Sequence, residues 1–257
     1  MRVRPNPWPL YGAELAGTGL LVAVGCSIVI LDFGAGSPVA RLLPSPEARR
    51  ALTGFLFGTT GALIALSPVG KVSGAHLNPA VTLAFWLVGR LRTRVALGYV
   101  LAQLAGGALG AVALRGWGAM GASVAYAATL PGHGEWAAVL GEAAATFALI
   151  AGLLAFLGHP RLRRFTPALF PPLYALLVWI EAPLSGASTN PARSLGPGLV
   201  AGAMGGWWVY WLGPLAGTIA AVALQRAPRL RSHEVEVAKV THFAHDRYGV
   251  FGDTRRK

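Results

Sequence analysis

Six long apolar stretches constrain this chain more than any other feature of its sequence. They lie at about 9–31, 51–69, 95–114, 136–157, 167–183 and 206–224. Each approaches the roughly 20 residues that a helix needs to cross the hydrocarbon core of a bilayer. Charged residues make up only 12% of the chain and hydrophobic residues 54%, whereas an ordinary soluble domain has about 25% charged residues. The pattern predicts an all-α membrane protein with six transmembrane helices.

One short phrase occurs twice in the chain. SGAHLNPAV occupies 73–81 and SGASTNPAR occupies 185–193, and each contains one of the chain's three asparagines. The first and fourth stretches also match, as GAELAGTGLL and GEAAATFALI, and the third and sixth share LAG. Each half of the chain therefore has three spans, with the phrase between its second and third. Because three is odd, the halves must have opposite orientations, which is the inverted-repeat plan of many transport proteins.

The apolar run that follows each Asn-Pro-Ala sequence is too short to cross a bilayer. It continues for about nine residues after Pro79 and is similarly short after Pro191, so both runs are predicted to be re-entrant half-helices. Proline in the first helical turn loses no hydrogen bond, and asparagine suits the N-cap position before it. Non-helical backbone at this depth is tolerated only where it is buried or lines water. We therefore expect two half-helices that enter from opposite faces and meet cap to cap.

This meeting point would favour neutral molecules over ions. Each half-helix directs about half a positive elementary charge at it, and the amides of Asn78 and Asn190 can donate hydrogen bonds to a passing oxygen. Positive dipoles and alternating donors and acceptors pass water and reject cations and protons. The backbone before each asparagine is expected to continue the path or form its vestibule through Gly74, Ala75, His76, Gly186, Ala187 and Ser188.

The paired motifs, with Arg193 after the second, resemble those of the aquaporin (major intrinsic protein) family over about residues 9–224. The resemblance implies a homotetramer with one pore per subunit, and no cofactor or metal is expected. It implies that Arg193 is the selectivity-filter arginine, that Glu14 and Glu142 are buried glutamates that hold loop N–H groups, and that His76 lines the cytoplasmic vestibule or packs beside it. The pore motifs would be formed by Asn78, Pro79, Ala80, Asn190, Pro191 and Ala192.

The other filter positions depart from the pattern of water-specific channels. Counting back from Asn190 places Val178 where such channels usually have histidine, and Ala187 at the loop position. In the second span, a direct count from Asn78 gives Gly58 and a one-residue shift gives Phe57. Gly58 follows Gly54 by four residues, so close helix packing is an equal interpretation. We expect a filter that is wider and more apolar than that of a strict water channel.

Residues outside the filter favour water. Ser194 stands where glycerol channels usually have aspartate, and Tyr210-Trp211 is the form typical of water channels, although Gly198 departs mildly. Glu181, near the end of the fifth span, could pair with Arg193 or simply be solvated.

The net charge of +12 is distributed in a way that indicates membrane topology and not nucleic-acid binding. Basic residues gather before the first span, at 90–94, at 161–164 and after the sixth span, and the positive-inside rule places all of these on the cytoplasmic side. The predicted organisation is a cytoplasmic N-terminus (1–8), a channel domain (9–224, with repeats at about 9–114 and 136–224) and a solvated cytoplasmic tail (225–257). A metal site at His242 and His245 in that tail is the less favoured interpretation.

The favoured function is a passive channel in the cell membrane for water and other small neutral solutes. The alternatives are a glycerol or broad neutral-solute facilitator and, in a different class, a structural or adhesion protein with an inactive pore. An enzyme is not expected, because the apolar region contains none of the familiar catalytic motifs.

Overall fold

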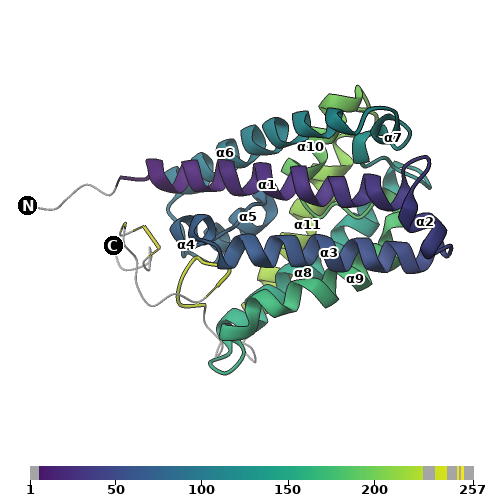
Figure 1. Cartoon of the computed structure of the whole chain (residues 1–257). Coiled ribbons are helices and arrows are strands. Elements are labelled where there is room, and N and C mark those ends of the chain that lie inside the picture. Colours follow the sequence, from purple (N-terminus) through teal and green to yellow (C-terminus); the bar gives the residue numbers. More distant parts are fainter. Residues whose placement is uncertain (1–5, 228–234, 242–247, 249, 252–257) are drawn as a thin grey trace, which may run out of the picture.

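The computed structural model describes residues 6–227, 235–241, 248, 250 and 251, and the elements in these ranges are helical (Figure 1). Six long helices correspond to the six predicted spans: α1 (Trp8–Phe33), α3 (Pro46–Leu66), α6 (Thr93–Val112), α8 (Glu135–Gly158), α9 (Thr166–Ser185) and α11 (Val209–Gln225). Two shorter helices, α5 (Pro79–Leu87) and α10 (Pro191–Ala201), begin at the prolines of the two motifs. The predicted all-α fold, with six spans and two half-helices, is confirmed.

The connections contain short helices that the hydrophobic pattern does not reveal. They are α2 (Pro38–Leu42), α4 (Pro68–Ser73), the 3-10 helix η1 (Ala113–Trp117), α7 (Gly118–Ala122), and the 3-10 helices η2 (Ala125–Ala127) and η3 (Arg163–Phe165). The second predicted span, 51–69, is divided, because α3 ends at Leu66 and α4 begins at Pro68. Proline disfavours helical backbone in the residue before it, and the Ser67 hydroxyl caps the new helix by accepting from Gly70 N–H at 3.3 Å.

By length and apolarity, four helical segments can cross a membrane on their own: Trp8–Phe33, Thr93–Ala122, Glu135–Gly158 and Arg163–Ser185. The other two spans are α11, an apolar helix of 17 residues, and α3. The first turns of α3 carry Glu47, Arg49 and Arg50. These charged residues precede the apolar part of the helix and lower its mean hydropathy.

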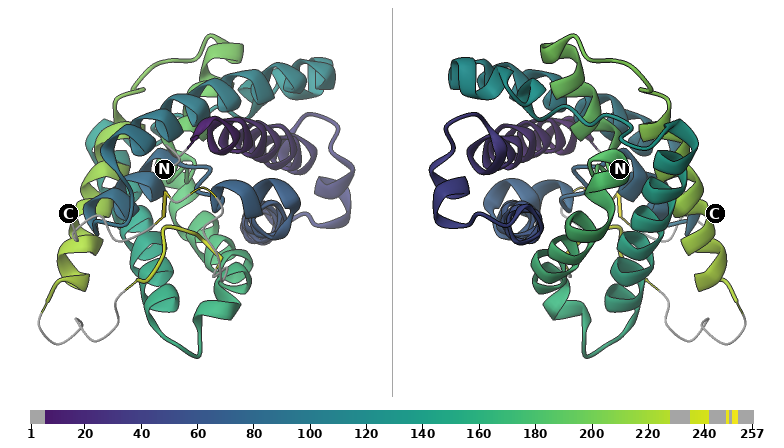
Figure 2. Two further views of the ribbon diagram at one scale, coloured as in Figure 1. Left: turned by 90° about the vertical axis from the view of Figure 1, so that its left-hand side faces the viewer. Right: turned by 90° about the vertical axis from the view of Figure 1, so that its right-hand side faces the viewer.

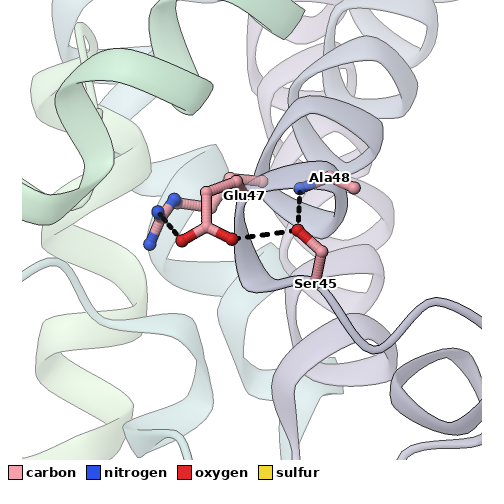
Figure 3. Close-up of polar contacts among 4 residues, drawn as sticks. Ser45, Glu47 and Ala48 are labelled. Atoms are coloured by element: carbon pink, nitrogen blue, oxygen red, sulfur yellow. Dashed lines mark hydrogen bonds and ion pairs between the residues drawn. The ribbon is translucent and has the colours of Figure 1, made fainter.

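The start of α3 is fixed by side chains of its first turn (Figure 3). The Ser45 hydroxyl accepts a hydrogen bond from Ala48 N–H at 3.2 Å and donates to the Glu47 carboxylate at 2.9 Å. Glu47 in turn forms an ion pair with Arg50 at 3.2 Å. An N-cap of this kind satisfies a backbone donor that has no partner within the helix. It therefore helps to set the register of the helix that carries Phe57 and Gly58.

The packing of the helices follows the two halves of the sequence. In the first half α1 packs on α6, and in the second half α8 packs on α11. A Cβ atom on Gly106 would clash with the carbonyl of Leu15, and one on Gly217 would clash with that of Ala143. These glycines are the final residues of the two LAG sequences, so the same close approach of backbones occurs in both halves.

The two halves also pack on each other. α3 and α9 cross between them, α10 packs on α6, and α5 packs on α11. Each half-helix is thus held by the third span of the opposite half. Figure 2 looks along the bundle, with α1 and α3 seen end-on, and Figure 1 shows the start of α1 and residues 235–241 at the same end.

Candidate functional site

The two half-helices meet at their asparagines. Asn78 Nδ2 donates to the carbonyl of Thr189 at 2.9 Å, and Asn190 Nδ2 donates to the carbonyl of Leu77 at 2.9 Å. Each side-chain oxygen also caps its own helix, since Asn78 Oδ1 accepts from Ala80 N–H at 2.8 Å and Asn190 Oδ1 accepts from Ala192 N–H at 3.0 Å. The prolines and alanines of both motifs are buried in the first turns of α5 and α10. The helices therefore meet cap to cap, and each is tied to the loop of the other.

Two buried glutamates hold the loops before the asparagines. The Glu14 carboxylate accepts from His76 N–H at 3.0 Å and from Leu77 N–H at 2.7 Å. Gln103 Nε2 donates to the same carboxylate at 2.7 Å. In the second half, the Glu142 carboxylate accepts from Ser188 N–H and Thr189 N–H, both at 2.7 Å. Buried backbone donors need partners of this kind, so both glutamates have the loop-holding geometry that the resemblance implies.

The loops themselves have unusual backbone geometry. Gly74 and Gly186 have φ values of 86° and 89°, which glycine adopts readily. Four non-glycine residues are also in the left-handed region, with φ between 52° and 55°: Ala75, Leu77, Ala187 and Thr189. Such residues cost about 1–3 kcal/mol each and persist only where their surroundings enforce them. The hydrogen bonds to the two glutamates hold these residues in this conformation.

Two tyrosines brace the loops in equivalent positions. Tyr99 Oη donates to the carbonyl of Ser73 at 2.6 Å, and Tyr210 Oη donates to the carbonyl of Ser185 at 2.8 Å. These roles were not predicted from the sequence, although the signal was present. Aligning the third and sixth stretches on LAG places Tyr99 opposite Tyr210.

Arg193 lies in the first turn of α10 and is only 4% exposed. Its Nη1 donates to the carbonyl of Ala127 at 2.8 Å, so the 3-10 helix η2 positions the guanidinium. Its Cζ lies 5.9 Å from the centre of the Phe57 ring, within the range of a cation–π interaction. Phe57 of α3 and Arg193 are therefore neighbours across the two halves.

Gly58, the other candidate in α3, packs against a helix. A Cβ atom there would clash with the backbone of Phe170, and one on Gly54 would clash with that of Tyr174, both in α9. The two glycines therefore let α3 and α9 approach closely, while the side chain of the residue before Gly58 reaches Arg193. This geometry favours Phe57 over Gly58 as the filter residue, and the assignment stays a prediction.

The remaining filter candidates are less well defined by contacts. Ala187 is buried in the second loop, and Val178 is half-buried in α9. Ser188 is buried, and its hydroxyl donates to the carbonyl of Asn190 at 2.9 Å. Glu181 is buried, which contradicts the interpretation that it is solvated, and its carboxylate accepts from the Ser185 hydroxyl at 2.5 Å.

A cavity of about 50 Å³ runs along the junction. It is lined by residues of both halves, among them Phe57, Tyr174, His76, Asn78 and Asn190. A water molecule needs roughly 10–15 Å³, so the cavity has room for a few water molecules. Tyr174, which the sequence analysis missed, lies 5.8 Å from Phe57 between ring centres and shares a hydrogen bond of 3.0 Å with the Thr189 hydroxyl.

His76 lines this cavity and is buried. Its Nε2 is 3.0 Å from the carbonyl of Ala238, and its Nδ1 is 3.1 Å from Thr82 Oγ1. Because a carbonyl only accepts, Nε2 must carry a proton, and in the neutral ring Nδ1 accepts from the Thr82 hydroxyl. The ring also stacks on Phe85, with 4.5 Å between centres.

The part of the tail around Ala238 departs from the prediction of a solvated extension. Within 235–241, the buried residues are Val235, Ala238, Lys239, Val240 and Thr241. Three of them are apolar, and they join the main hydrophobic core. The candidate metal ligands His242 and His245 lie outside the described residues.

Comparison with known proteins identifies the family of this chain. The family model of the major intrinsic proteins matches residues 4–224. Aquaporin NIP1-2 of Oryza sativa subsp. japonica is 32% identical over 213 residues, which cover 80% of this chain and 67% of the relative. Aquaporin-8 of Rattus norvegicus is 35% identical over 213 residues, which cover 79% of this chain and 74% of the relative. The chain belongs to the major intrinsic protein family.

A solved structure shows the same fold. The aquaglyceroporin from Plasmodium falciparum superposes with a TM-score of 0.69 over 88% of this chain and 98% of its own, at 20% sequence identity. At that identity the likeness bears on the fold alone.

Proposed function

We propose that this protein is a passive membrane channel that conducts water, and other small neutral solutes, through the junction of its two halves. The family supports the general class of channel. The observation that carries the specific proposal is that Asn78 and Asn190, each bonded to the opposite loop, both line one cavity. An amide nitrogen has two hydrogens, and the bond to the opposite loop uses one of them. The second is available to a molecule in the cavity.

The surroundings of the asparagines support the exclusion of ions. The N-terminal ends of α5 and α10 face each other there, so a cation would meet two positive dipole ends. Arg193 adds a permanent positive charge beside Phe57. A neutral molecule meets donors from the amides and acceptors from the loops, which is selectivity by pore lining.

Osmotic shrinkage of proteoliposomes followed by stopped flow tests this function. Both the full chain and a variant without residues 228–257 should be measured over a series of protein doses. We expect the shrinkage rate of at least one of them to rise with dose, without a parallel rise in proton leak. Rates equal to those of empty vesicles for both chains at every dose would refute the channel.

The choice of solute is proposed to depend on Val178. Replacing it with histidine adds a polar ring to a predicted apolar position of the filter. We expect Val178→His to lower the ratio of glycerol flux to water flux by about tenfold, the scale at which small pocket changes discriminate between ligands. Val178→Ile is the control, since it adds volume without a hydrogen-bonding group. An unchanged ratio in Val178→His would show that Val178 does not lie at the constriction, whereas a high glycerol flux relative to water flux in the parent chain would favour a broad neutral-solute facilitator.

We further propose that the protein is a homotetramer in the cell membrane with both termini in the cytoplasm. The two ends of the described chain lie at the same end of the bundle (Figure 1), and the basic clusters of the sequence support the cytoplasmic assignment. Exposed leucines on several spans offer the apolar surface that lipid or a neighbouring subunit would cover.

A further inference from the structure

The C-terminal segment 235–241 returns to the bundle after α11 has ended. In Figure 1 it lies beside α4, at the end of the bundle where the N-terminus is also found. Ala238 is fully buried, and Val235, Lys239, Val240 and Thr241 are nearly so, whereas the Glu236 side chain is 61% exposed. A solvated tail would not bury five of seven residues, so this segment occupies a specific position on the bundle.

The segment is held by hydrogen bonds to the first loop. Val240 N–H donates to the carbonyl of Gly74 at 2.8 Å. The protonated Nε2 of His76 donates to the carbonyl of Ala238 at 3.0 Å. Gly74 and His76 are among the residues predicted to form the path or vestibule on this side. The segment therefore forms hydrogen bonds with polar groups that a passing solute would otherwise contact.

Two side chains from other connections hold the same segment. Arg90, which follows α5, donates from Nε to the carbonyl of Val235 at 2.5 Å. Arg163, in η3, forms an ion pair with Glu236 at 2.7 Å. We use the term pore mouth for the site formed by Gly74, His76, Arg90 and Arg163. Gly74, His76 and Arg90 belong to the first half of the chain and Arg163 to the second. Residues 235–241 therefore contact both halves at the pore mouth.

Residues 235–241 lie close to the candidate pore. Val240 lines the same cavity as Asn78 and Asn190. Gly74 is approached so closely that a Cβ atom there would lie 2.9 Å from the Ala238 carbonyl oxygen and 2.9 Å from Lys239 Cγ. With the segment in this position, its apolar side chains and backbone occupy the end of the path.

We propose that residues 235–241 are an intrachain ligand of the pore mouth and close the channel when bound. This inference rests on the proposed channel function. The occupant is an extended peptide recognised mainly through its backbone carbonyls and N–H groups, and only its release opens the path to the asparagines. The described conformation is the closed one.

Two full-length variants that create the same side chain test the proposal. Ala238→Gln places a long polar side chain at a fully buried position of the segment, whereas Glu135→Gln places it at an exposed position in the first turn of α8. If the closed state is about 90% populated, release of the segment raises water permeability by about tenfold. We expect that rise in Ala238→Gln and less than a twofold change in Glu135→Gln, since exposed substitutions away from the segment have small effects.

A second variant and a peptide keep the test independent of one substitution. Val240→Pro removes the N–H that donates to Gly74 and should also raise water permeability. A synthetic peptide of residues 228–257, added inside vesicles that contain Ala238→Gln, should restore closure, and the same peptide with Ala238→Gln should not.

The outcomes separate this proposal from the channel function. If the full chain, Ala238→Gln and Val240→Pro conduct water equally, the pore conducts and the segment does not close it. If none of them conducts, and the chain without residues 228–257 is also inactive, the channel function itself fails. Higher conduction in Ala238→Gln and Val240→Pro, reversed by the unaltered peptide alone, is the result the proposal requires.

Discussion

Glu142→Ala is expected to lower the free energy of unfolding by about 3 kcal/mol or more. The substitution leaves the backbone N–H groups of Ser188 and Thr189 without their buried acceptor. Each buried donor without a partner costs about 1–3 kcal/mol. The second loop, already in the left-handed region at Ala187 and Thr189, would lose the contacts that enforce this backbone.

Thermal unfolding in detergent, followed by circular dichroism, measures this effect. Glu135→Ala is the matched control, because Glu135 is an exposed residue in the first turn of the same helix and surface substitutions usually stay within about 0.5 kcal/mol. Glu14→Ala should resemble Glu142→Ala, since Glu14 has the equivalent bonds in the first half. Equal melting temperatures for Glu142→Ala and Glu135→Ala would contradict the role assigned to the buried carboxylate.

Gly58→Ala is expected to destabilise the protein by about 1–3 kcal/mol, the usual cost of overpacking a tight contact. The added methyl group would clash with the backbone of Phe170 in α9. Backbone cannot move aside as a flexible side chain can, so α3 and α9 must separate. Phe57, the preceding residue in α3, would then shift away from Arg193.

Gly61→Ala, one turn further along α3, is the control for that experiment. A methyl group there would meet only Leu21 Cδ1, at an ordinary distance of 3.8 Å. Removing a glycine from a helix interior then gains up to about 1 kcal/mol, so Gly61→Ala should melt at the same temperature as the parent chain or above it. If Gly58→Ala also melts no lower than the parent, the close packing of α3 on α9 does not limit stability.

The repeated elements could be predicted from the sequence because repetition and apolar length are visible in it. The six spans, the half-helices after Pro79 and Pro191 and the paired glutamates all follow from comparing the two halves. The register of Phe57 and Gly58 could not, because one residue turns a helical side chain by about 100° and only the contact with α9 decides which faces Arg193. The backbone of Ala75 and Leu77 was equally hidden, since neither residue type favours the left-handed region.

The burial of residues 235–241 was not predicted, for a similar reason. A region of mixed charge with few large apolar residues is typical of a solvated extension. Its burial depends on acceptors and donors that other segments supply, such as the Gly74 carbonyl and the Arg90 guanidinium. Such partners are distant in sequence, and no local pattern in 235–241 indicates them.

The reciprocal asparagine bonds have a consequence for biosynthesis. During translation, the loop around Asn78 is complete long before Thr189 is made, so the Asn78 amide must wait for its acceptor and Leu77 for its donor. Glu14 and Tyr99 of the first half already hold this loop, but the Leu77 carbonyl gains its donor only from Asn190, and a backbone group without a partner is costly in hydrocarbon. The first re-entrant segment should therefore stay hydrated until the ribosome has delivered the second, which makes its insertion one of the last steps of assembly.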